Sequence, residues 1–147
     1  MNVLSNLILA AVLILSFGAN AYPEFARNDG HRTIIFFAPE KDEHVRQFQT
    51  QVLMNKCQLD QRDIVVLVAT HDGYSSPSGL FSLDDIALLQ DIFDIPDKGH
   101  TALLIGKDGE EKHRWGKRTD WNGLTQFIDG MPLRRHEMKF QSDKCSV

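Results

Sequence analysis

The sequence lacks most of the features that would assign a chain to a well-defined chemical class. Its formal net charge of −4 over 147 residues gives no basic surplus, which argues against a general nucleic-acid binder. It has no glycine-rich phosphate loop, no nucleophile elbow with Ser, His and Asp, and no carboxylate pair suited to glycoside chemistry. It has no Asn-x-Ser/Thr acceptor, so N-glycans are not expected, and no cofactor is predicted.

The composition that is present suits an ordinary globular domain. Hydrophobic residues make up 42% of the chain and aromatic residues 9%. A chain of 147 residues is long enough for one domain with one hydrophobic core. We therefore expect a single folded domain, and the arrangement of its strands and helices has to come from local patterns.

The first 21 residues differ from the rest and predict a signal peptide. Leu7–Phe17 is an almost uninterrupted apolar run, and an Ala-Asn-Ala triplet at 19–21 provides a cleavage site. The run is shorter than the ~20 residues that span a bilayer, although a retained anchor is the alternative. Cleavage would leave a mature chain that starts at Tyr22, has no membrane span, and is exported to the periplasm or secreted.

The remaining chain divides into a lead-in at 22–31, a domain at 32–138 and a polar tail at 139–147. Two short β-branched and apolar runs, RTIIFFA at 32–38 and DIVVLVA at 63–69, predict buried strands. Between them, Asp42 can cap a helix whose apolar residues follow helical spacing until about Lys56. A strand, a helix and a strand joined by short links predict a parallel unit.

The second half of the domain predicts a helix, a hairpin and a helix. A Gly/Ser/Pro loop at 71–81 leads to a capping box at Ser82. An apolar strand at 101–105, a KDGE turn and a charged edge strand at 111–115 form the hairpin. A last helix, capped by Thr119 or Asp120, ends at Gly130 and Pro132.

This order, β-α-β-α-β-β-α, predicts an α/β fold of the thioredoxin-like class with a mixed four-stranded sheet. Three stretches also resemble a known family: NKCQLDQRDIVVL at 55–67, LLIGKDGEEKHRW at 103–115 and FIDGMPLRRHEMK at 127–139. They resemble the peroxiredoxin-like domain of unknown function (P-DUDES) of bacterial exported proteins and vertebrate sushi-repeat-containing proteins. The resemblance runs from about Arg32 to Lys139, and it implies a thioredoxin-like fold and a proposed thiol peroxidase activity.

The residues of a standard thioredoxin site are nevertheless missing. A reactive cysteine should follow the first strand, where the helix dipole stabilises a thiolate, but APEKDEHVR at 38–46 has none. The position just before the third strand, which should hold a cis-proline, is His100, and Pro96 lies too far upstream. The sequence therefore argues against the usual dithiol centre.

The chain has two cysteines, Cys57 and Cys145. We expect Cys57 at or just past the end of the first helix, where the dipole disfavours a thiolate. Our interpretation is a structural disulfide between the two, which export makes chemically possible. The alternative is catalytic, with Cys57 as the reactive thiol and Cys145 as the resolving thiol.

Two further groups of residues are weaker candidates. His44, His71, Asp72 and His100 lie toward one edge of the predicted fold, where a metal is conceivable, but no ligand-spacing motif supports one and none is predicted. Arg134, Arg135 and Lys139 form a basic cluster that could bind an acidic partner. The alternative for these arginines is a solvated tail or local pairing with Asp129 or Glu137.

Taken together, these patterns predict an exported thioredoxin-like domain without the usual dithiol site, which binds a protein partner or a small ligand. The alternative function is a thiol oxidoreductase or peroxidase that uses Cys57 and Cys145. The redox state of the two cysteines, and their reaction with peroxide, distinguishes the two functions.

Overall fold

The computed structural model describes residues 30–145 of the chain. The expected signal peptide at 1–21, and the lead-in up to residue 29, lie outside the described residues. Within residues 30–145 no helix has both the length and the apolar character needed to cross a membrane.

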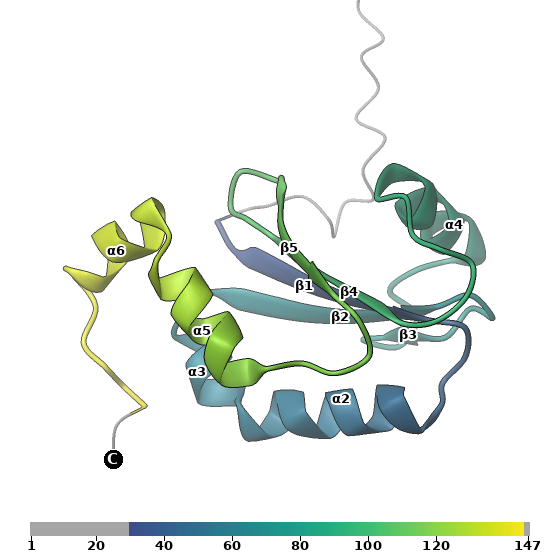
Figure 1. Cartoon of the computed structure of the whole chain (residues 1–147), viewed down its shortest axis with the longest axis horizontal. Coiled ribbons are helices and arrows are strands. Elements are labelled where there is room, and N and C mark those ends of the chain that lie inside the picture. The colour runs from purple at the N-terminus through teal and green to yellow at the C-terminus, as the bar shows by residue number, and fades with distance from the viewer. Residues whose placement is uncertain (1–29, 146–147) are drawn as a thin grey trace, which may run out of the picture.

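The core of the fold is one mixed sheet of five strands in the order β3-β2-β1-β4-β5 (Figure 1). β1 and β2 run parallel, and the other neighbouring pairs are antiparallel. The central position of β1 explains its composition, because all seven of its residues are buried. The strands are β1 (Arg32–Ala38), β2 (Ile64–Thr70), β3 (Ser75–Ser76), β4 (Thr101–Ile105) and β5 (Glu111–Trp115).

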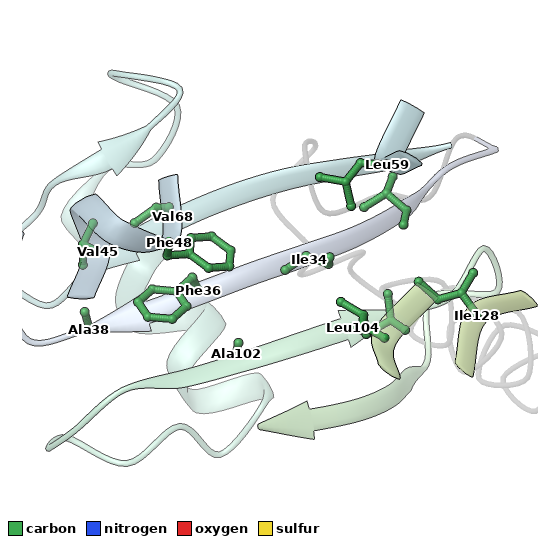
Figure 2. Close-up of a cluster of buried hydrophobic side chains, with 12 residues drawn as sticks. Ile34, Phe36, Ala38, Val45, Phe48, Leu59, Val68, Ala102, Leu104 and Ile128 are labelled. Atoms are coloured by element: carbon green, nitrogen blue, oxygen red, sulfur yellow. The ribbon is translucent and has the colours of Figure 1, made fainter. Parts of the chain in front are cut away.

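Helices cover both faces of this sheet and divide the core into two clusters. One face packs against α2, α3 and α5, and Figure 2 shows Phe36, Phe48 and Leu104 at that contact. The other face packs against α4, where Ile35 and Phe37 of β1 meet the helix. The five helices of the described residues are α2 (Glu43–Met54), α3 (Lys56–Asp60), α4 (Leu83–Ile92), α5 (Trp121–Asp129) and α6 (Pro132–Met138).

The predicted helix caps are confirmed. The Asp42 carboxylate accepts a hydrogen bond of 3.0 Å from the Val45 N–H at the start of α2. Ser82 and Asp85 form the capping box of α4, and Asp120 rather than Thr119 caps α5. The start of each of these helices is therefore determined by residues next to one another in the sequence, within the first helical turn.

The predicted hairpin is confirmed with both strands at their expected bounds. The N–H of Gly106 donates to the Glu110 carbonyl oxygen at 2.9 Å and closes the turn. Gly109 has a φ of +83°, a conformation that glycine adopts without a side-chain clash. β4 is buried in the middle of the sheet, and β5 forms a charged edge.

Three parts of the expected fold are corrected. The sheet has five strands rather than four, because Ser75–Ser76 in the expected loop pairs with Val68 and Ala69. The first helix ends at Met54 rather than near Lys56, and Cys57, just past its end as expected, lies in a separate short helix, α3. Pro132 does not stop helical structure but begins α6, because proline lacks only an N–H that the first helical position leaves unpaired.

Candidate functional site

The carboxyl ends of the parallel strands β1 and β2 meet the start of α2 and the residue before β4. In open α/β sheets ligands bind in the crevice beyond this edge. Five polar residues gather there, and we call them the carboxyl-end cluster: Lys41, Asp42, His44, Tyr74 and His100. These residues come from the β1-α2 connection, from α2, from the β2-β3 connection and from the segment before β4.

Asp42 and His100 form the centre of this cluster. The Nε2 atom of His100 donates to Oδ2 of Asp42 at 2.6 Å, while Oδ1 of Asp42 caps α2 through Val45. Burial alone would raise the pKa of Asp42, but the Val45 N–H and the His100 imidazole hold it below its ordinary value. Asp42 is therefore a carboxylate that orients the ring of His100.

Aromatic contacts fix the same imidazole. The rings of His44 and His100 lie edge to face with their centroids 5.0 Å apart, and Phe36 of β1 lies 5.9 Å from His100. His100 is thus held in one orientation by a carboxylate and by two rings.

Tyr74 extends the cluster toward β3. Its hydroxyl accepts a hydrogen bond of 2.9 Å from Nε2 of Gln49, and the Lys41 ammonium lies 4.4 Å from its ring centroid. The Gln49 hydrogen bond and the nearby Lys41 lower the pKa of Tyr74 despite its partial burial. The cluster therefore contains two groups with perturbed pKa values, Asp42 and Tyr74, which is common at functional sites.

The histidines considered as metal ligands have different hydrogen-bond partners. His71 and Asp72 follow β2, where the His71 N–H donates to the Ala38 carbonyl oxygen at 3.0 Å and Asp72 accepts from the Thr70 hydroxyl. The Nε2 atom of His71 is buried without a hydrogen-bond partner. Across residues 30–145 no group of three or more His, Cys, Asp or Glu side chains could hold a metal ion.

The two cysteines are joined in a disulfide at the opposite end of α2. Cys57 lies in the first turn of α3, Cys145 lies in the C-terminal segment, and their Cα atoms are 5.8 Å apart. Neither thiol is free. A pocket of about 550 Å³ adjoins the bond and is lined by both cysteines and by Lys56, Asp60, Gln61, Asp63, Gln141, Ser142 and Lys144.

The basic residues considered for partner binding separate in space. Arg134 is only 1% exposed, whereas Arg135 and Lys139 are exposed on the surface. The Arg134 guanidinium donates to Oδ1 of Asp129 at 3.2 Å and lies 3.5 Å from the Glu137 carboxylate. The local pairing considered above is therefore what the structure shows for Arg134.

Arg134 belongs to a larger ionic network that the sequence did not reveal. Arg32 and Lys107 each bind the Glu137 carboxylate, at 3.1 Å and 2.8 Å. Arg62 forms two hydrogen bonds with Asp129, at 3.0 Å and 2.6 Å. Five of these six residues, all except Arg32, come from the three stretches quoted for the family resemblance, where each resembles an ordinary surface charge. No spacing rule could have joined Arg32 or Arg62 to these carboxylates, because those contacts link residues 105 and 67 positions apart.

Comparison of the sequence with models of known protein families assigns the chain to one family. A family model described as a domain of unknown function, DUF4174, matches residues 26–137. No curated protein matches the chain. The matched segment includes all the strands found within residues 30–145 and almost all of α6. Because the match spans most of the sequence, the chain belongs to the DUF4174 family of domains of unknown function.

Proposed function

We propose that this chain is an exported, thioredoxin-like domain that binds a ligand or a protein partner at the carboxyl-end cluster and has no dithiol centre there. The parallel β1-α2-β2 unit, followed by the β4-β5 hairpin and α5, has the order of a thioredoxin core. The resemblance to the peroxiredoxin-like P-DUDES domains supports the same fold.

One observation carries this proposal. At the start of α2, where a thioredoxin-like redox protein has its reactive cysteine, the chain has Asp42 bonded to His100. Both cysteines are instead bonded to each other beyond the far end of the helix. The N-terminus of α2 could stabilise a thiolate, but in this chain it is capped by the Asp42 carboxylate, which also binds the His100 imidazole.

The chemistry of the cluster favours recognition over covalent catalysis. Asp42, His100 and Tyr74 provide acceptors and donors with fixed directions, and Lys41 adds a positive charge. Neither Cys57 nor Cys145 lies among these residues, and within residues 30–145 no group of three or more His, Cys, Asp or Glu side chains could hold a metal ion. A polar ligand, or a polar segment of a partner, matches this set of groups.

Export is part of the proposal. The apolar run at 7–17 and the triplet at 19–21 support a signal peptide, and a disulfide persists in oxidising compartments such as the periplasm or the extracellular space. Intact-mass measurement of the exported protein should give a chain that starts at Tyr22. A mature form that still carries residues 7–17 would contradict a cleaved signal.

Thiol chemistry provides the sharpest test of the missing redox centre. In the peroxidase alternative, a Cys57 thiolate takes an oxygen from hydrogen peroxide, forms a sulfenic acid and releases hydroxide; the Cys145 thiol then condenses with it, releasing water. We expect the reduced protein to consume one equivalent of hydrogen peroxide slowly, at a rate that Cys57→Ser does not change. Fast consumption that Cys57→Ser abolishes would overturn the proposal.

Binding at the cluster can be tested by NMR. A fragment set of small carboxylates, amides and phenols is titrated into the oxidised full chain, and we expect shift changes to concentrate on the backbone of Asp42, His44, Tyr74 and His100. His100→Gln should weaken them at least tenfold, whereas His136→Gln, on the surface of α6, should not. Shift changes confined to other surfaces would contradict the assigned site.

A further inference from the structure

The outer edge of β2 is only partly covered. β2 has seven residues, but β3 pairs with two of them, Val68 and Ala69. Within residues 30–145 no strand pairs with Ile64–Leu67 on that side. In the part of the chain that the structure describes, four residues of the strand therefore present a free edge, whereas proteins usually protect such an edge with charge, proline or a covering segment.

The backbone bonds identify the groups that point outward. The Arg32 N–H donates to the Asp63 carbonyl oxygen, and the His71 N–H donates to that of Ala38, so the odd-numbered residues face β1. The Thr70 N–H donates to the Tyr74 carbonyl oxygen on the opposite side. Ile64 and Val66 therefore turn their N–H and C=O groups to the free edge, where they can form an antiparallel ladder with another strand.

Apolar side chains border this edge on both faces of the sheet. A groove of about 340 Å³ runs between α2 and β2, lined by Phe48, Gln49, Val52, Leu53, Val66, Val68 and Ser76. Leu53 is 72% exposed in that groove, and Val65 is 41% exposed on the other face. Exposed apolar surface beside an unpaired strand marks an interaction site more often than scattered apolar residues do.

The charge pattern indicates what covers the edge. Residues 47–55 (QFQTQVLMN) and 64–70 (IVVLVAT) contain no charged side chain, although 24% of the whole chain is charged. Interface cores are depleted of charge in this way. A second copy would bring the same uncharged surface, so the two copies could meet here without like-charge repulsion despite a net charge of −4 each.

We propose that the chain forms a two-fold homodimer through β2. The two strands run antiparallel with the axis at Val65, so that Ile64 of each copy exchanges backbone hydrogen bonds with Val66 of the other. The Val65 residues then form a non-hydrogen-bonded pair with Cα atoms about 4.5 Å apart. The α2 helices come to lie on the same face, which covers Leu53, and the two sheets become one continuous sheet.

Sedimentation analysis of the exported, disulfide-bonded protein tests the dimer. Over a concentration series we expect the mass to rise from that of one chain to that of two. Val65→Lys and Leu53→Lys should each raise the dimer dissociation constant at least tenfold, because each buries a charge at the axis or in the groove. Leu83→Lys is the matched control, since Leu83 is 61% exposed at the start of α4 and lies beside Gly73, beyond the C-terminal end of β2 and not at Ile64–Leu67.

A cross-linking experiment tests the register. Val65→Cys should form an intermolecular disulfide on air oxidation, because a non-hydrogen-bonded pair of facing strands meets the disulfide geometry. Leu83→Cys should stay monomeric on a non-reducing gel. A chain that remains monomeric at every concentration, or a dimer that neither lysine variant weakens, would overturn the proposal. A monomer that instead binds an extended apolar peptide at β2 would show that a different partner occupies the edge.

Discussion

Arg134 shows how single residues determine the stability of this domain. A buried arginine is costly unless carboxylates and acceptors surround it, and Arg134 has Asp129, Glu137 and the side-chain oxygen of Gln141 within 3.5 Å. Truncation would remove the cation and leave these groups without it. We expect Arg134→Ala to lower the free energy of unfolding by about 3–5 kcal/mol in urea melts.

The neighbouring arginine provides the control. Arg135 is exposed in the same helix, so Arg135→Ala should change the free energy of unfolding by less than about 0.5 kcal/mol. If the two variants lost similar small amounts of stability, the network around Arg134 would contribute little to the free energy of unfolding. A role of Arg134 in partner binding would then have to be reconsidered.

Glu137 makes the same network sensitive to pH. Burial raises the pKa of Glu137, but Lys107 and Arg32 outweigh it and hold the pKa below its ordinary value of 4.5. Because the folded-state pKa is the lower one, the carboxylate stabilises the fold above pH 4.5, and this contribution is lost as the pH falls through the folded-state value.

Glu137→Gln should therefore be destabilising at pH 7, and its difference from the wild type should shrink as the pH falls from about 5 to 3. Urea melts at each pH measure it. Glu110→Gln is the control, because Glu110 is exposed and pairs with Lys112, outside this network. A gap between Glu137→Gln and the wild type that stays constant down to pH 3 would contradict the assignment.

At the scale of elements, local signals predicted most of the sheet. β1, β4 and β5 have the bounds expected from their β-branched, apolar or charged residues, and β2 is shifted by one residue at each end. The caps at Asp42, Ser82 and Asp120 were also predictable, because each is a contact within one helical turn. These features depend on neighbours in sequence, so one sequence was enough.

Two elements were not predicted from the sequence. One depends on contacts between distant residues, and the other begins at a proline that we interpreted as a helix end. β3 has two serines and owes its pairing to β2, so no strand propensity marks it. α6 begins at Pro132, which indicated a helix end, and its first turn contains the buried Arg134, which resembled a surface charge. The network that holds α6 joins residues up to 105 positions apart, beyond any local pattern.

The burial of β4 in the β4-β5 hairpin leads to a prediction about a single core residue. Leu104 lies in the middle of β4 and is fully buried against α5 and β1. Leu104→Ala should lower the free energy of unfolding by ~2–5 kcal/mol, the sum of a lost transfer term and a cavity term. Denaturant melts measure this loss, and a value below ~1 kcal/mol would show that the site collapses around the smaller residue.

At the scale of the whole molecule, the site was only partly predictable. The topology placed His44 and His100 toward one edge, and the structure brings their rings to 5.0 Å. The pairing of His100 with Asp42 and the contact of Lys41 with Tyr74 needed coordinates, because each joins residues from separate elements. The sequence predicted a Cys57–Cys145 bond as one interpretation of the two cysteines, and the structure contains that bond.

The disulfide links the C-terminal segment to the body of the protein, which gives the last prediction. It joins residues 88 positions apart, so it restricts the unfolded chain strongly. On the chain-entropy model, closing a loop of this length stabilises the fold by ~4 kcal/mol. The oxidised wild type should therefore unfold at higher urea than the reduced wild type, and Cys57→Ser should match the reduced protein with or without reductant. Cys145→Ser should behave in the same way, because either change opens the same loop. If the oxidised and reduced forms unfolded together, the bond would restrain little of the unfolded chain, and a role in thiol exchange would account for it better than a structural one.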